Sequence, residues 1–258
     1  MFVAERHERI RSILIKKRHI EVAVLGAMLG VSEGTIRRDL DKLEHQGFLT
    51  KTHGGAVLND RIDEPPLPSD DTEFMLADDY RAVSKVAACL VQNNDAIFVA
   101  GGAIAVNLAQ QLKDRQRLTI MTNDLEVGRQ LSGCAGVRLI ITGGNVLQAA
   151  YVMVGPLAER SLEGVFVDRA FICVRGVDLV HGYTVDMPEE AEFLRAVMRV
   201  AKETVVMAVC TQFDRVGFAP LCELGAIQKL VSNKEVPDTY KQFLFQQNVQ
   251  VFTTYDIE

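Results

Sequence analysis

The chain has 258 residues, of which 48% are hydrophobic and five are cysteines, and its net charge is −6. Its longest apolar runs fall far short of the roughly 20 residues that span a bilayer, and its N-terminus lacks the basic and apolar regions of a secretory signal. We therefore expect a cytoplasmic protein with no membrane segment. The cysteines show neither CxxC spacing nor a neighbouring histidine cluster, so we expect no metal site and no cofactor.

Two short helices separated by a tight turn are predicted near the N-terminus. Gly30 stands where a left-handed residue would end the first helix, and Ser32 is a natural N-cap for the second, which covers residues 31–43. This arrangement is a helix-turn-helix. The apolar residues of the first helix repeat at helical spacing and are Val22, Leu25, Met28 and Leu29.

The second helix combines one apolar stripe with several polar faces. Ile36, Leu40 and Leu43 fall at i, i+4 and i+7 and predict the buried side. Because an arginine can grip a phosphate or pair with guanine, the polar faces suit the major groove of DNA. The polar side chains are Thr35, Arg37, Arg38, Asp41 and Lys42.

A short β-hairpin is predicted after this helix. Residues 48–58 alternate around the pair Gly54-Gly55, in the manner of a tight turn between two strands. Such a wing would lay Lys51 and His53 against a phosphate backbone or in a minor groove. Residues 1–58 are therefore predicted to form a winged helix-turn-helix DNA-binding domain.

Charge is unevenly distributed along the chain. Residues 1–57 carry a net charge of +3 and four of the five histidines, whereas the remaining residues carry −9. Positive charge is thus concentrated where DNA would bind. An excess of this size is modest, and one small winged helix offers little contact area. We therefore expect a homodimer or homotetramer.

Residues 59–80 have the composition of a solvated linker. They contain three prolines and eight acidic residues and show no sustained periodicity. Two interpretations stay open for this segment. It is either a spacer, or its acidic residues oppose nonspecific DNA contact or dock against the winged helix.

From residue 81 to residue 258, helices alternate with short apolar strands. Because the strands are apolar throughout, they predict a mainly parallel α/β sheet with helices on both faces. Helices are expected at residues 81–91, 105–112, 125–131, 156–162 and 189–202, and strands at 96–100, 118–122, 137–142, 169–174 and 204–209.

Four loops at the carboxyl ends of these strands are candidate ligand-binding elements, because open α/β sheets bind ligands there. The first loop is rich in glycine and precedes a helix, where an anion can approach backbone N–H groups. The four loops are residues 100–103, 122–124, 142–145 and 174–178.

Several stretches of this chain occur together in one known family. They are SEGTIRRDLDKLEHQGFLTKTHGGAVL, VMVGPLAERSLEGVFVDRAFI, Thr122-Asn123, Gly143-Gly144, Gly176 with Asp178, His181-Gly182, and Glu189-Glu190-Ala191 followed by Arg195. With these stretches the chain resembles the DeoR family of bacterial transcriptional regulators. The resemblance implies a winged helix-turn-helix and a sensor domain that is similar in fold to ribose-5-phosphate isomerase and binds phosphorylated sugars or their derivatives.

The first loop departs from the family pattern of an acidic residue, serine, glycine and several threonines. Here residues 100–105 read AGGAIA, with no hydroxyl group, and residues 209–213 read VCTQF in place of Asp-Ser-Ser-Lys-Phe. Leu147 and Leu194 replace basic residues, while Arg175 is new and would either supply the missing positive charge or pair with a carboxylate. Because two or three charge-assisted hydrogen bonds are lost, our hypothesis is that the pocket has changed its ligand or lost it.

The sequence therefore predicts a non-enzymatic DNA-binding regulator, a repressor of a carbohydrate-metabolism operon controlled by a sugar phosphate or related metabolite. Two alternatives stay open: a C-terminal half that only oligomerises, and an isomerase-like enzyme with Asp178 or Glu190 as general base. The residues predicted to bind the double-stranded DNA operator are Ser32, Thr35, Arg37, Arg38, Lys42, Lys51 and His53. Those predicted to bind the effector are Gly101, Gly102, Ala103, Thr122, Asn123, Gly143, Gly144, Arg175, Asp178, Glu190 and Arg195.

Overall fold

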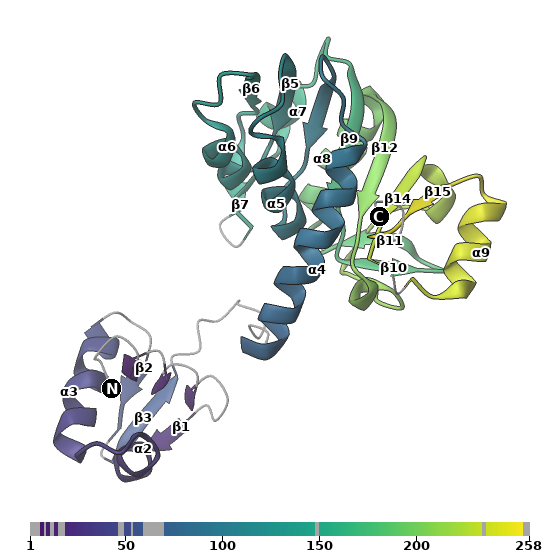
Figure 1. Ribbon diagram of the computed structural model, residues 1–258. Coiled ribbons are helices and arrows are strands. Elements are labelled where there is room, and N and C mark those ends of the chain that lie inside the picture. Colours follow the sequence, from purple (N-terminus) through teal and green to yellow (C-terminus); the bar gives the residue numbers. More distant parts are fainter. Residues whose placement is uncertain are drawn as a thin grey trace. The chain divides into compact units, whose positions relative to one another are not determined.

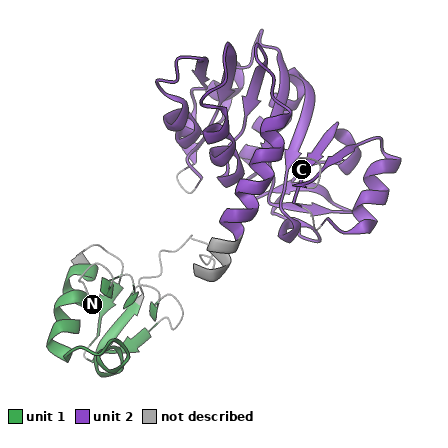
Figure 2. Ribbon diagram, viewed as in Figure 1, with its two compact units in different colours: residues 1–74 green, residues 75–258 purple. Residues whose placement is uncertain are grey.

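The chain forms two compact units, residues 1–74 and 75–258 (Figure 2). Helix α4 (Asp70–Cys89) runs across this division. In the described ranges no helix is both long and apolar enough to cross a membrane. The structure, a computed structural model, describes residues 6–7, 9–10, 13–14, 19–45, 49–52, 54–58, 70–147, 150–233 and 236–254.

The N-terminal unit has the predicted winged helix-turn-helix arrangement (Figure 1). Its three strands form an antiparallel sheet in the order β1-β3-β2. The first strand is three residues long and was not predicted, because so short a segment shows no readable alternation. The elements are β1 (His19–Glu21), α2 (Val22–Leu29), α3 (Glu33–His45), β2 (Leu49–Lys51) and β3 (Gly55–Leu58).

Local chemistry explains where the two helices meet. Gly30 adopts φ 65° and ends α2, where its N–H donates to the Gly26 carbonyl. The Ser32 hydroxyl accepts a hydrogen bond from the Thr35 N–H at 3.3 Å, which confirms the predicted N-cap of α3. Gly55 is needed for close packing, since a Cβ there would lie 2.3 Å from the Ile20 carbonyl oxygen of β1.

The core of this unit lies under α3. Ile36, Leu40 and Leu43 are fully buried, as their spacing predicted. Met28 is 52% exposed, which corrects its place in the predicted apolar face of α2. Val22 and Leu25 of this helix are buried in the core, and the partly buried Leu29 packs against it.

Helix α4 corrects the expectation that residues 59–80 form an irregular linker, since its first residue is Asp70. Acidic residues that look like a solvated linker are also favourable in the first turn of a helix, next to its positive dipole end. Further along, Val83, Val86 and Ala87 recur at helical spacing and are buried. Packing of this face onto the second unit favours a helix over a free linker.

The second unit is built on a seven-stranded sheet in which every strand pair is parallel, in the order β15-β14-β12-β9-β4-β5-β6. This confirms the predicted mainly parallel sheet. The strands are β4 (Ala96–Val99), β5 (Leu118–Thr122), β6 (Val137–Ile141), β9 (Val167–Cys173), β12 (Ala201–Met207), β14 (Lys229–Val231) and β15 (Gln250–Phe252).

Helices cover both faces of the sheet, as the apolar strands predicted. Phe98 points into one core cluster and its neighbours Ile97 and Val99 into the other, so β4 is buried on both sides. Helices α4, α5 (Ala103–Leu112) and α6 (Leu125–Leu131) pack on the second cluster. Helices α7 (Pro156–Arg160), α8 (Pro188–Val200) and α9 (Asp238–Gln246) pack on the first.

Two smaller sheets accompany the seven-stranded sheet, and their strands were not predicted from the sequence. A hairpin joins β7 (Asn145–Leu147) to β8 (Val152–Val154), and an antiparallel sheet is formed by β10 (Gly176–Asp178), β11 (Gly182–Val185) and β13 (Ala219–Cys222). The predicted helix 189–202 is wrong at its end, because α8 stops at Val200 and Lys202 belongs to β12.

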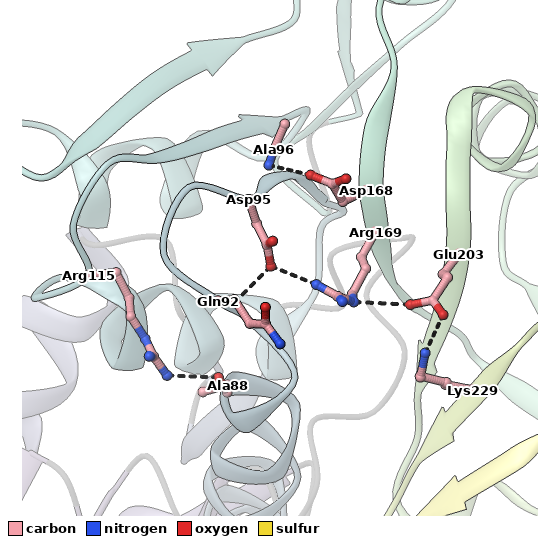
Figure 3. A network of polar contacts seen from close by, with 9 residues as sticks. All are labelled: Ala88, Gln92, Asp95, Ala96, Arg115, Asp168, Arg169, Glu203 and Lys229. Carbon is pink, nitrogen blue, oxygen red and sulfur yellow. Dashed lines mark hydrogen bonds and ion pairs between the residues drawn. The ribbon is translucent and has the colours of Figure 1, made fainter.

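A chain of alternating charges ties together the amino ends of four strands, opposite the predicted ligand loops (Figure 3). The Arg169 guanidinium lies 2.6 Å from the Asp95 carboxylate and 3.1 Å from that of Glu203. Lys229 completes the chain, with its Nζ 2.5 Å from the Glu203 carboxylate. These side chains are 13–28% exposed, so the network is screened from solvent and holds the registers of β4, β9, β12 and β14.

Candidate DNA-binding and ligand-binding sites

One side of α3 carries free positive charge. Because a helix turns about 100° per residue, Thr35, Arg38 and Lys42 lie along one side that excludes the buried stripe. Arg38 and Lys42 are exposed, and neither forms an ion pair with another described residue. This side can approach a phosphate backbone or base edges without first breaking an ion pair.

The other polar side of α3 is occupied by ion pairs. The Arg37 guanidinium lies 3.0 Å from the Glu33 carboxylate one turn earlier. Lys51 of β2 pairs with Asp41, which raises the Lys51 pKa, and its backbone N–H donates to Glu44 at 2.8 Å. Lys51, predicted to hold the DNA backbone, thus joins the wing to α3.

The remaining two predicted DNA-binding residues are Ser32 and His53. The Ser32 hydroxyl lies 3.0 Å from the Thr35 hydroxyl and caps α3, so its polar atom already has partners within the helix. His53 lies outside the described residues.

The buried carboxylate of Asp39 joins α3 to the first described residues of the unit. Asp39 is 3% exposed and accepts hydrogen bonds from Arg6 Nε at 2.6 Å and Arg6 Nη2 at 3.2 Å. Its carboxylate also lies 2.9 Å from His7 Nε2. Burial raises the pKa of Asp39, but hydrogen bonds from Arg6 and His7 outweigh it and the pKa is lowered overall. Sequence analysis missed this pair, because no local pattern links residues so far apart in the chain.

A cavity of about 200 Å³ opens at the carboxyl end of β9, beside the first predicted loop. It brings together five of the predicted effector residues, Gly101, Gly102, Ala103, Arg175 and Glu190. A larger depression between α9 and β15 contains none of them. The other residues that line the cavity are Tyr80, Ile104, Ala150, Cys173, Val174, Val185, Asp186 and Gln212.

The glycine loop is packed closely from behind. A Cβ at Gly101 would lie 2.1 Å from the Val152 side chain of β8, and one at Gly102 would lie 3.0 Å from the Cys173 sulfur. The Gly102 N–H donates to the Asp124 carboxylate at 3.3 Å. Asp124 also caps α6, and its burial raises its pKa. Both glycines are therefore required by the neighbours of the loop.

Thr122 and Asn123 lie beneath the loop and do not line the cavity. They are 0% and 1% exposed. The Thr122 hydroxyl accepts from the Asp124 N–H at 3.1 Å, and the Asn123 amide donates to the Met153 carbonyl at 3.1 Å. Their polar groups hold α6 and the hairpin β7–β8 against the sheet.

Gly143 and Gly144 lie at the base of the same hairpin, away from the cavity. A Cβ at Gly144 would lie 2.7 Å from the Val154 carbonyl oxygen, and this residue adopts φ 133°. The glycine is needed for the close approach of β8.

Asp178 and Arg195 also serve the fold. The Asp178 carboxylate accepts hydrogen bonds from the N–H groups of Val180 and His181 and contacts the His181 ring at 2.8 Å. Arg195 donates to the Pro220 carbonyl at 2.7 Å and so joins α8 to β13. Neither residue lines the cavity.

The cavity contains one cation and two carboxylates. Arg175 Nε lies 3.5 Å from the Asp186 carboxylate, and both side chains are more than half exposed. Glu190 forms no hydrogen bond or ion pair with any described residue. Burial, with repulsion from Asp186, raises its pKa to about 7.

Several lining residues were not predicted. Tyr80 was placed in the linker, although its spacing from Val83 and Ala87 matches the buried face of α4. Cys173 and Asp186 carried no signal in the sequence. Gln212, which stands where the family pattern has a lysine, donates to the Val174 carbonyl and thus closes one wall.

A helix-turn-helix unit joined to an α/β unit with a polar cavity is the organisation of a ligand-controlled transcriptional regulator. Two family models match the chain: the DeoR-like helix-turn-helix domain over residues 6–62 and the DeoR C terminal sensor domain over residues 77–234. The chain belongs to the DeoR family.

Curated relatives agree with this assignment. The HTH-type transcriptional regulator YulB of Bacillus subtilis is 30% identical over 97% of this chain and 96% of its own length. A putative aga operon transcriptional repressor of Escherichia coli is 28% identical over 96% of this chain and 93% of its own. A solved ribose 5-phosphate isomerase A of Methanocaldococcus jannaschii overlays on 52% of this chain and 53% of its own, with 17% identity and TM-score 0.39.

Proposed function

We propose that this DeoR-family regulator is a repressor that binds an operator through the free side of α3 and responds to a small sugar-like ligand in the β9 cavity. The observation that carries the first part is the alignment of Thr35, Arg38 and Lys42 on one side of the helix, where neither Arg38 nor Lys42 forms an ion pair with another described residue. Repression is supported by the Escherichia coli relative, which is named as an aga operon transcriptional repressor, and a carbohydrate operon is supported by the family resemblance.

The cavity is connected to α4 by Tyr80. This half-buried tyrosine lines the cavity, and burial raises its pKa. The same helix begins at Asp70 and crosses the boundary between the two units. A ligand that touches Tyr80 therefore touches the element that leads toward the DNA-binding unit. Control of DNA affinity requires that the ligand contact α4 differently in two conformations.

The test begins with operator selection from a random DNA library, followed by fluorescence anisotropy on the selected sequence. Lys42→Ala is expected to weaken binding about equally for all sequences and to reduce the salt slope by about one. Lys113→Ala, on the surface of the second unit, is the control. Selection of no sequence, or a Lys42→Ala slope equal to that of the control, would contradict the proposal.

We also propose that the regulator acts as a homodimer or homotetramer, because one α3 helix buries less area than a specific operator complex requires. Sedimentation equilibrium with and without operator DNA tests this. A monomer bound alone to the selected site would contradict it.

A further inference from the structure

The glycine loop before α5 offers a phosphate few groups to bind. A phosphate at the start of a helix needs free backbone N–H groups. Here the Gly102 N–H donates to Asp124. The Cys173 side chain packs against the same loop, since a Cβ at Gly102 would lie 3.0 Å from its sulfur. Burial raises the pKa of this thiol to about 12, so it stays neutral.

The charges around the rest of the cavity also disfavour an anion. Among the described residues that line it, the one arginine is Arg175, which is paired with Asp186. Glu190 faces the same space with no partner among the described residues. Once Arg175 and Asp186 cancel, the ionised Glu190 leaves the lining with one net negative charge. A phosphate ester would meet this charge without a free cation to balance it.

We propose that the ligand is a small polyhydroxylated molecule that carries an ammonium group and no phosphate, with the ammonium group on the Glu190 carboxylate. The exposed pair of Arg175 and Asp186 is available to hydroxyl groups, and a cavity of about 200 Å³ limits the ligand to a small molecule. This inference rests on the proposed function, because it assigns the ligand class of the same cavity.

The surroundings of Glu190 give the proposal a pH signature. Asp186 precedes α8 and repels the carboxylate. Cys173 lines the cavity from the end of β9, Arg175 from the loop after β9, and Tyr80 from α4. Since the pKa of Glu190 is about 7, its charged fraction rises between about pH 6 and about pH 8. Binding of an amine that stays protonated is expected to strengthen over this interval, and binding of an uncharged polyol is not.

The experiment is isothermal titration calorimetry on the full chain with matched sets of probes: a polyol or sugar, its primary-amine derivative and its phosphate ester, on five- and six-carbon skeletons. We expect the amine to bind about tenfold more tightly than its uncharged parent, as one charge-assisted hydrogen bond allows. Glu190→Gln is expected to remove this preference. Arg175→Met, which frees Asp186, is expected to preserve or increase it.

The outcomes separate this inference from the proposed function. A phosphate ester that binds more tightly than the amine, and loses affinity in Arg175→Met, overturns the inference but leaves a ligand-controlled regulator. Amine binding that is equal in wild type and Glu190→Gln also overturns it. If no probe of any class binds to protein that still binds operator DNA, both the ligand class and ligand control are refuted, while operator binding stands.

Discussion

Replacing Asp39 by asparagine tests whether the buried carboxylate holds the recognition helix in place. The substitution keeps the shape of the side chain but removes its charge. It also puts an amide nitrogen where one carboxylate oxygen now accepts a hydrogen bond from Arg6 or His7. Two donors that belong to the first residues of the unit would then face a neutral group.

The magnitude follows from burial. Breaking a buried ion pair by removing one partner costs about 3 to 5 kcal/mol, and Asp39 is 3% exposed. Because Asn retains one acceptor, we expect a loss of about 2 to 3 kcal/mol in the free energy of unfolding of the N-terminal unit. A unit of this size rarely has more than about 5 kcal/mol to lose, so α3 would be partly unfolded at physiological temperature.

The assay is hydrogen exchange of the α3 amides in the full chain, with operator binding measured in parallel. Asp41→Asn is the matched control, since it makes the same change on the same helix at a half-exposed side chain. Exchange should accelerate at Ile36 and Leu40 in Asp39→Asn only. If both variants exchange and bind DNA alike, the carboxylate does not position α3. Replacing Arg6 and Asp39 together by methionine should recover part of the loss.

Three further predictions concern the other charges. Arg38→Ala should weaken specific operator binding by about 1 to 3 kcal/mol. Arg37→Ala should weaken it less, because Arg37 is paired with Glu33. Equal losses of affinity in anisotropy titrations would refute the proposal that α3 contacts DNA through the side that carries Arg38. Arg169→Met should cost about 2 kcal/mol of stability, since it leaves the partly buried Asp95 carboxylate without a cation and Glu203 with Lys229 alone. Arg138→Met, at an exposed position of the edge strand β6, is the control, and equal denaturation midpoints would contradict the network. Burial raises the pKa of Glu190 to about 7, so the folded state keeps a proton that the unfolded chain releases, and stability falls as pH rises from about 4.5 to about 7. Glu190→Gln should remove up to about 2 kcal/mol of that fall, and an unchanged difference between unfolding free energies at about pH 5 and about pH 8 would refute the shift.

The strongest sequence signals were those with a local cause. Ile36, Leu40 and Leu43 share one side of α3 because the helix repeats every 3.6 residues. Gly30 ends α2 because glycine, which has no Cβ, adopts φ 65° at no steric cost. The alternation of apolar strands with helices predicted a parallel sheet covered on both faces. In each of these cases the residues that determine the structure are close together in the sequence.

The sequence predicted only some of the residues that line the cavity. Gly101, Gly102, Ala103 and Arg175 meet in the cavity because the loops after the parallel strands β4 and β9 share one edge. Glu190 joins them from the first turn of α8. Polar residues at the same edge, however, can equally well satisfy the backbone. Asn123 binds the Met153 carbonyl, and no property of its sequence neighbourhood distinguishes this role from ligand binding.

The position of Tyr80 sets a limit on how strongly the cavity can control DNA binding. A ligand shifts an equilibrium only by the difference in its binding free energy between two states. One hydrogen bond to the Tyr80 hydroxyl contributes about 0.5 to 1.5 kcal/mol, which changes DNA affinity at most about tenfold. A stronger response requires that the ligand also change the packing of α4 around Val83 and Val86, which are buried against the same core as the α5 residues Ile104 and Ala105. The first turn of α5 lines the cavity and belongs to the same apolar core as α4, so this core offers a second route by which one small ligand can act on that helix.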